Sequence, residues 1–126
     1  MTTGVLIDTH IVLWLRMEPH KLTAAERQIL DASLTLFVSA VSVWEIAMLL
    51  GRGRIPGGND QLLSLLPSLD WLPIKPDHCR AMAALPRLHR DPFDRMLIAQ
   101  AQSEQLPLLT RDRAMRSYHA HATFLP

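Results

Sequence analysis

Short apolar runs alternate with longer amphipathic segments along the chain. Val5–Ile7 is one such run and ends at Asp8 and Thr9, a pattern that predicts a buried strand followed by the start of a helix. Comparable runs predict further strands over residues 34–40, 71–74, 106–109 and 122–125. Helical patterns predict helices over residues 10–17, 24–33, 44–50, 61–66, 78–85, 92–105 and 113–118. This alternation predicts an α/β fold, a three-layer α/β/α sandwich around a mainly parallel central sheet, in a single domain over residues 1–126.

Three of the predicted helices begin with capping signals. Two have the capping-box pattern, a hydroxyl residue followed three positions later by glutamate: Thr23–Glu26 and Ser42–Glu45. The third, Asp91–Asp94, places an N-cap residue before a proline and an acid in the first turn. Glycine-rich residues 51–59 predict a loop or the corner of a helix hairpin. The tryptophans lie within apolar stretches, so we expect them in the core: Trp14, Trp44 and Trp71.

Composition narrows the class of protein. The apolar fraction of 48% excludes a disordered chain, and 13 Lys and Arg against 12 Asp and Glu exclude a nucleic-acid binder that works by net charge alone. The only cysteine, Cys79, cannot form an internal disulfide, which favours a reducing compartment. No targeting segment or run of about 20 apolar residues is visible, so we expect a soluble cytoplasmic protein without a membrane span.

Four acids follow predicted strands. Asp8 ends the first strand, Glu45 lies in the first turn after the second, Asp94 in the first turn of the helix at 92–105, and Asp112 just after the strand at 106–109. The carboxyl ends of parallel strands meet at one edge of a sheet, so these side chains could meet there. Clustered carboxylates repel one another unless they are protonated or bind a cation, and such oxygen ligands suit Mg²⁺ or Mn²⁺.

Three of these acids have an ordinary structural interpretation as well. Glu45 completes a capping box, Asp94 is favourable in a first helical turn, and Asp112 is an N-cap residue type. Asp8 directly follows a buried run and therefore needs a partner. The spacing by itself leaves both the metal site and the capping roles open.

Four segments together resemble the PIN domain and, within that superfamily, the VapC-type toxins of bacterial toxin–antitoxin modules. They are Ile7–His10, Ser39–Ile46, His89–Ala101 and Leu109–Asp112, in the family's order and at family-like length. The resemblance implies an endoribonuclease that depends on Mg²⁺ or Mn²⁺ and hydrolyses RNA phosphodiester bonds with the 3′ oxygen leaving. It also implies an antitoxin that docks along the first two helices, where apolar residues exceed what a small sheet covers, and a toxin homodimer.

The resemblance assigns roles to individual residues. Asp8, Glu45 and Asp94 match the family's three defining acids, and Asp112 matches the more variable fourth. The hydroxyl positions that support the acids are matched by Thr9 and Thr110, whereas Asp91 is interpreted as the N-cap of its helix.

Arginine is the dominant cation, and six of the eleven arginines flank Asp94 or Asp112. Arg90, Arg95 and Arg111 are therefore candidates to contact RNA phosphates, the alternative being that they pair with nearby acids or are solvated. The six histidines show no zinc-ligand spacing, and His10 is expected to be a partly buried helix residue.

Two other functions stay open at this point. A receiver-like phosphoacceptor domain would use Asp8 as the acceptor, but Thr110-Arg111-Asp112 lacks the lysine expected at the end of a late strand. A degenerate PIN-like module would bind RNA or protein without cutting, and the intact acids Asp8, Glu45 and Asp94 disfavour it.

Overall fold

A four-stranded parallel sheet forms the middle of the molecule. The computed structural model describes residues 4–33, 35–58, 64 and 69–126. The strands are β1 (Gly4–Ile7), β2 (Thr35–Ser39), β3 (Asp70–Leu72) and β4 (Leu108–Leu109), in the order β3-β2-β1-β4. All three pairings are parallel, for example Val5 with Leu36 and Ile7 with Leu109. The predicted parallel sheet is therefore confirmed.

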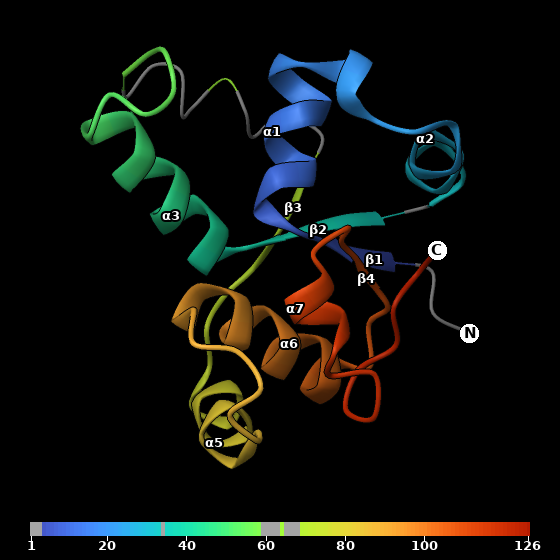
Figure 1. Ribbon diagram of the computed structural model, residues 1–126, viewed down its shortest axis with the longest axis vertical. Coiled ribbons are helices and arrows are strands. Elements are labelled where there is room, and N and C mark those ends of the chain that lie inside the picture. The colour runs from blue at the N-terminus through green and yellow to red at the C-terminus, as the bar shows by residue number, and fades with distance from the viewer. Residues whose placement is uncertain (1–3, 34, 59–63, 65–68) are drawn as a thin grey trace.

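Helices cover both faces of this sheet. They are α1 (Thr9–Met17), the 3-10 turn η1 (Pro19–Lys21), α2 (Ala24–Ala32), α3 (Ala40–Gly51), α5 (Pro76–Ala84), α6 (Pro92–Glu104) and α7 (Arg113–Arg116). Figure 1 shows α1 and α2 on one side of the sheet and α5, α6 and α7 on the other, while α3 contacts both α1 and α6. This arrangement is the predicted three-layer α/β/α sandwich.

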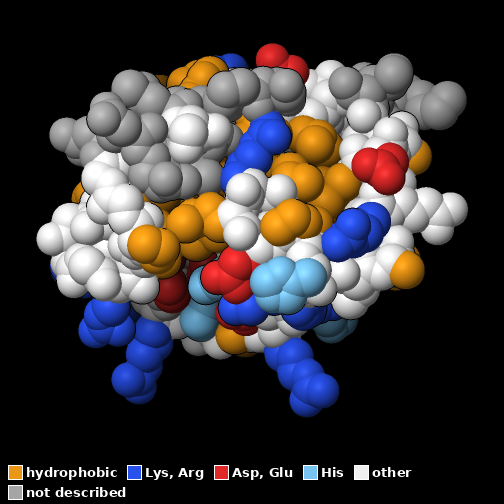
Figure 2. Space-filling model, turned by 90° about the horizontal axis from the view of Figure 1, so that it is seen from above, with side chains coloured by type: hydrophobic (Ala, Val, Ile, Leu, Met, Phe, Trp, Pro, Cys, Tyr) orange, Lys and Arg blue, Asp and Glu red, His pale blue; other side chains and the backbone are white. Residues whose placement is uncertain are grey.

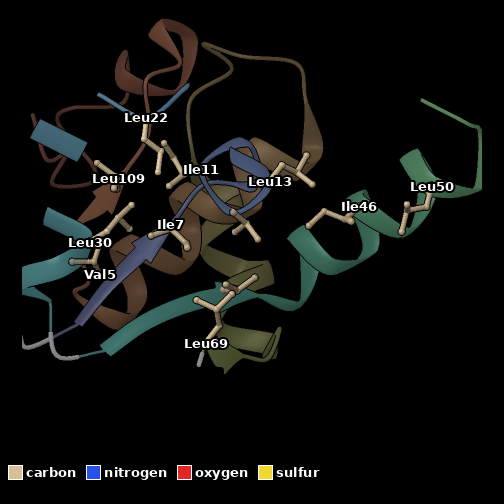
Figure 3. Packing of buried hydrophobic residues seen from close by; sticks show 12 residues of the cluster. Val5, Ile7, Ile11, Leu13, Leu22, Leu30, Ile46, Leu50, Leu69 and Leu109 are labelled. Carbon is tan, nitrogen blue, oxygen red and sulfur yellow. The ribbon is translucent and has the colours of Figure 1, made fainter. Parts of the chain in front are cut away.

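The central strand β1 has a buried side chain at every position because helices cover both its faces. Val5 and Ile7 belong to the cluster beneath α1 and α2 (Figure 3), and Leu6 belongs to the cluster against α6 and α7. Burial on both faces explains why the sequence of β1 is continuously apolar instead of alternating. The rigid strand delivers its carboxyl end to the edge where Asp8 follows.

Several predicted boundaries differ from the structure. The strand predicted at 122–125 is reduced to a single bridge between Leu108 and Phe124, and β4 has two residues. Pro107 precedes β4 and Pro73 follows β3, and a proline has no N–H to continue a ladder. Most of the helix predicted over 61–66 lies outside the described residues. No helix in the described part of the chain is long and apolar enough to cross a membrane.

The prediction that all three tryptophans lie in the core is wrong for two of them. Trp14 is half-buried against the cluster beneath α1, but Trp44 is 59% exposed and Trp71 45% exposed. In α3 apolar residues occur nearly all round the helix, so periodicity could not identify its solvent face. The Trp44 ring makes an edge contact with the Phe93 ring of α6, with 5.1 Å between the ring centroids.

Candidate active site

Asp8 lies at the carboxyl end of β1 and is almost completely buried. Only 4% of it is exposed, and its Oδ2 accepts a hydrogen bond of 2.7 Å from the Thr110 hydroxyl. Burial raises the pKa of Asp8, although the Thr110 hydrogen bond opposes the rise; repulsion from Asp112 adds to it. Asp8 occupies the N-cap position of α1 but makes no side-chain capping bond, so its carboxylate is directed to other partners.

Thr110 connects Asp8 to Asp112. Its hydroxyl oxygen accepts from the Asp112 backbone N–H at 3.1 Å. Asp112 Oδ1 in turn accepts from the Met115 N–H at 3.1 Å, so the N-cap interpretation of Asp112 is confirmed. The carboxylate of Asp112 is nevertheless solvent-exposed and close enough to raise the pKa of both Asp8 and Asp94.

Glu45 does not form the predicted capping box. β2 runs directly into α3, and Ser39 is the N-cap, its Oγ accepting the Val41 N–H at 3.0 Å. Ser42 is therefore inside the helix, where its hydroxyl lies 2.9 Å from the Thr9 hydroxyl, and Glu45 lies in the second turn instead of the first. This frees the Glu45 carboxylate for the carboxyl edge of the sheet.

The pKa of the Glu45 carboxylate is raised above its usual value. Burial raises its pKa most, and the charges of Asp91 and Asp8 raise it further, while a hydrogen bond from Thr9 lowers it. Its Oε1 atom is buried and has no hydrogen-bond partner among the described residues. A buried carboxylate oxygen without a partner is costly, so this atom fits a ligand position for a cation.

Asp94 is in the first turn of α6, as predicted. Asp91 is the N-cap of this helix: its Oδ1 accepts from Phe93 N–H at 2.9 Å and from Asp94 N–H at 3.4 Å. Burial raises the pKa of Asp94 to about 6, and the charges of Asp91, Asp8 and Asp112 contribute, against a hydrogen bond from His89. These effects show that Asp94 interacts electrostatically with Asp8, Asp91 and Asp112.

Sequence reasoning missed His89 and Tyr118. His89 Nε2 forms a 2.8 Å hydrogen bond with Asp94 Oδ2. Tyr118 is fully buried; its hydroxyl donates to Pro86 O at 2.7 Å and accepts the N–H groups of Leu88 and His89 at 3.0 and 3.1 Å. Tyr118 thus positions the turn that carries His89. The five-residue spacing between His89 and Asp94 was the available signal, but a histidine before an N-cap is not diagnostic.

Asp8 interacts electrostatically with Glu45, Asp94 and Asp112, but the group of possible metal ligands found among the described residues contains neither Asp8 nor Glu45. Ligand atoms of His89, Asp94 and Asp112 all lie within 4.8 Å of one another. Burial is the main cause of the raised pKa values of three acids, and neighbouring carboxylates raise them further: Asp8, Glu45 and Asp94. Figure 2 shows acidic and histidine side chains gathered next to hydrophobic surface, with extended Lys and Arg side chains projecting nearby. Oxygen-rich sites of this kind suit hard cations.

The three candidate arginines have different surroundings. Arg95 Nη2 donates to the carbonyls of Met82 and Leu85 at 3.0 and 3.3 Å, at the end of α5. Arg111 pairs with Glu26 and also donates to Lys21 O at 2.7 Å. Arg90 is exposed, and no side-chain partner is found for it in the part of the chain that the structure describes. Two of the three guanidinium groups are thus held by protein groups.

Comparison with known proteins agrees with this geometry. A model of the PIN domain matches residues 5–120. Ribonuclease VapC22 of Mycobacterium tuberculosis (strain ATCC 25618 / H37Rv) is 34% identical over 130 aligned residues, which cover 94% of this chain and 94% of that protein.

Solved structures share the fold at lower identity. VapBC2 from Rickettsia felis, bound to a DNA fragment from the promoter, aligns with a TM-score of 0.76 at 12% identity over 97% of both chains. A toxin–antitoxin complex from Klebsiella pneumoniae aligns with a TM-score of 0.70 at 18% identity over 97% of this chain and 96% of that one. With the match to the family model, the fold and the acidic edge lead to one conclusion: the chain belongs to the PIN-domain family.

Proposed function

We infer that this protein is a divalent-metal-dependent endoribonuclease that acts as the toxin of a toxin–antitoxin pair. One observation carries the inference most strongly, the convergence of Asp8, Glu45, Asp94 and Asp112 from four separate elements onto one edge of the sheet. The 34% identity to a ribonuclease over nearly the whole chain supports the reaction class. The intact acids disfavour a module that binds without cutting.

The four carboxylates would hold Mg²⁺ or Mn²⁺. Among the described residues, Glu45 Oε1 is a buried carboxylate oxygen without a hydrogen-bond partner, which makes it a candidate ligand atom. When bound, such an ion acidifies water and offsets negative charge on a phosphate. Thr110 holds Asp8 by its hydroxyl, so this carboxylate is oriented before substrate arrives, and Thr9 lowers the pKa of Glu45. His89 fixes one oxygen of Asp94.

Exposed Arg90 is the arginine we propose for contact with RNA phosphate. It directly precedes the N-cap of α6, near Asp94, and its charge is not used by a described acid. For Arg95 and Arg111, the contacts to protein carbonyls and to Glu26 support structural roles.

Substitution of an acid tests the activity. Asp94→Asn should keep the fold and lower Mn²⁺-dependent cleavage of a labelled single-stranded RNA by at least about 100-fold, because loss of even an outer-shell partner in metal sites costs about 10–100-fold. The matched control is Asp77→Asn, whose exposed carboxylate lies on α5. A chelator should abolish wild-type cleavage. Equal rates in wild type and Asp94→Asn, or activity in excess chelator, would contradict the proposed function.

We also propose an antitoxin partner and a homodimer. Structural neighbours of this chain include toxin–antitoxin complexes, which supports the partner. The expected apolar excess on the first two helices is partly used in the core, since Ile11 and Leu30 are buried. Co-expression with the neighbouring short reading frame, followed by light scattering of the purified complex, tests both points. A monomer that never associates with that product would refute them.

A further inference from the structure

A cavity of about 280 Å³ adjoins the four candidate acids Asp8, Glu45, Asp94 and Asp112, which we call the acidic cluster. Asp8 and Asp112 line one side, and His10, Trp14 and Arg111 line the rest. Sites for drug-sized ligands usually measure about 300–1,000 Å³, so this cavity suits a smaller, single ring system. Because it shares two acids with the cluster, a group bound there would be next to a phosphate held at the cluster.

The rest of the lining consists of two aromatic rings and a guanidinium. The Arg111 guanidinium lies over the Trp14 ring at 4.1 Å from its centroid, and the His10 ring lies 5.9 Å from the same tryptophan, tilted by 45°. His10 and Trp14 are four residues apart on α1 and therefore share one face of the helix. Aromatic rings and guanidinium planes are the surfaces on which proteins receive unpaired bases.

Arg111 is fixed and its charge is offset. Glu26 accepts from Arg111 Nε at 2.9 Å and from Nη2 at 2.5 Å, and the Lys21 carbonyl accepts a further bond. Glu26 itself is 5% exposed and is held by its capping bonds with Thr23. A guanidinium neutralised in this way offers a flat face to a ring more readily than a charge to a phosphate.

From this lining we infer that the cavity receives one nucleobase of the RNA, next to the phosphodiester bond that is cut, in contact with the Trp14 and His10 rings. The inference rests on the proposed function and makes His10, Trp14 and Arg111 determinants of where the enzyme cuts. Arg111 acts as a positioning residue, because it holds the Trp14 ring and is itself held by Glu26.

RNAs that lack one base test this pocket. The bond cut by wild type in a mixed-sequence, unstructured RNA is mapped first, and abasic ribose is then placed either 5′ or 3′ of it. One of these two RNAs should lose roughly 5- to 150-fold in kcat/KM, the range expected for one base stack. The loss should appear mainly as a higher KM.

Variants assign that loss to the cavity. In His10→Ala and Trp14→Phe the penalty for the missing base should shrink several-fold, whereas the matched controls His20→Ala and Trp71→Phe, at exposed residues that do not line the cavity, should keep the full penalty. His10 is exposed, so its replacement does not depend on repacking the core.

The outcomes separate this inference from the proposed function. If wild type cuts the parent RNA and both abasic RNAs equally well, the nucleobase inference is overturned and the ribonuclease stands. If the base penalty is present but unchanged in both cavity variants, the base binds elsewhere and the inference is again overturned. If His10→Ala disrupts only the complex with an antitoxin, the cavity holds a protein side chain instead. If the protein cleaves no RNA in a metal-dependent way, the proposed function itself is refuted.

Discussion

Two segments of this protein carry the same local pattern and use it in opposite ways. Thr23–Glu26 forms a complete capping box at the start of α2, with Glu26 bonded to the Thr23 N–H at 2.8 Å. Ser42–Glu45 matches the pattern equally well, but Ser39 has already begun α3, and Glu45 points to the acidic cluster. A capping-box sequence thus stabilises a helix in one place and supplies a candidate metal ligand in the other.

The charge environments of the two glutamates differ accordingly. The hydrogen bonds from Arg111 hold the pKa of Glu26 below its usual value, whereas burial and neighbouring acids raise the pKa of Glu45. Glu26 is satisfied by a cation within the protein, and Glu45 has a buried oxygen without such a partner. The comparison indicates that an unsatisfied acid in an acidic cluster is a better guide to function than its sequence pattern.

The largest effect should come from Glu45→Gln, which removes one charge from the cluster but keeps the side-chain shape. We expect RNA cleavage with Mn²⁺ to fall by at least about 100-fold, more than the loss of an outer-shell partner. The free energy of unfolding of the metal-free protein should be unchanged or higher, because acid–acid repulsion is relieved. Kinetics and urea unfolding measure the two quantities. Glu18→Gln, at a half-exposed ion pair with Lys21, is the control. Strong destabilisation with normal cleavage would mean that Glu45 is structural.

Glu26→Ala should change the free energy of unfolding more than it changes RNA cleavage, the reverse of Glu45→Gln. It removes the bond that Glu26 accepts from the Thr23 N–H in the capping box of α2, and it removes the partner of Arg111, so the free energy of unfolding should fall by about 2 kcal/mol. Urea denaturation of wild type and variant measures the change. Ala24→Gly at the first residue of the same helix provides a reference for a small helix perturbation, below the roughly 1 kcal/mol expected in a helix interior. A change below that of the reference would show that the capping box and ion pair add little.

The pH dependence of stability should separate the acidic cluster from Glu26. In the folded, metal-free protein the pKa of Asp94 is about 6 against an ordinary 3.8, so its stabilising contribution is complete below 3.8 and is lost as pH rises through 6. Lowering the pH from 7 to 5 should therefore stabilise wild type over Asp94→Asn by about 1 kcal/mol.

The lowered pKa of Glu26 acts with the opposite sign, since its contribution is present above 4.5 and is lost as the pH falls through the folded-state value. Thermal unfolding with chelator across pH 3 to 8 should show the loss of the Asp94 contribution as the pH rises and the loss of the Glu26 contribution as the pH falls. Parallel curves for wild type and Asp94→Asn would contradict the raised pKa.

The smallest expected effect distinguishes a free arginine from a paired one. Arg90→Ala should reduce the slope of log affinity against log salt by about 0.7 for single-stranded RNA, the value for one phosphate contact. Binding to the Asp94→Asn background, which should not cut the RNA, allows the measurement at equilibrium. Arg80→Ala on α5 is the comparison, because that exposed arginine already faces Asp77. An unchanged slope of log affinity against log salt would show that Arg90 does not contact an RNA phosphate.

Much of the framework could be predicted from local sequence. Val5–Ile7 is apolar at every position because both faces of β1 are covered. Asp91-Pro92 correctly predicts the start of α6 to within one turn. The predicted burial of Trp44 and Trp71 was wrong, because an apolar stretch does not say which neighbours are available to cover it. The strand at 122–125 was overpredicted for a related reason: strand length depends on what lies alongside.

Local sequence was enough to predict the α/β/α architecture, the order of the elements and the four candidate acids at or near the starts of helices. These features depend on periodicity and on residues within one or two turns of one another. The fold was needed to show that Glu26 pairs with Arg111, 85 positions away, that the acid bonded by Thr110 is Asp8, across 102 positions, and that Glu45 makes no capping bond. Such choices depend on which distant groups folding brings within hydrogen-bond reach, and burial then sets the charge each one can carry.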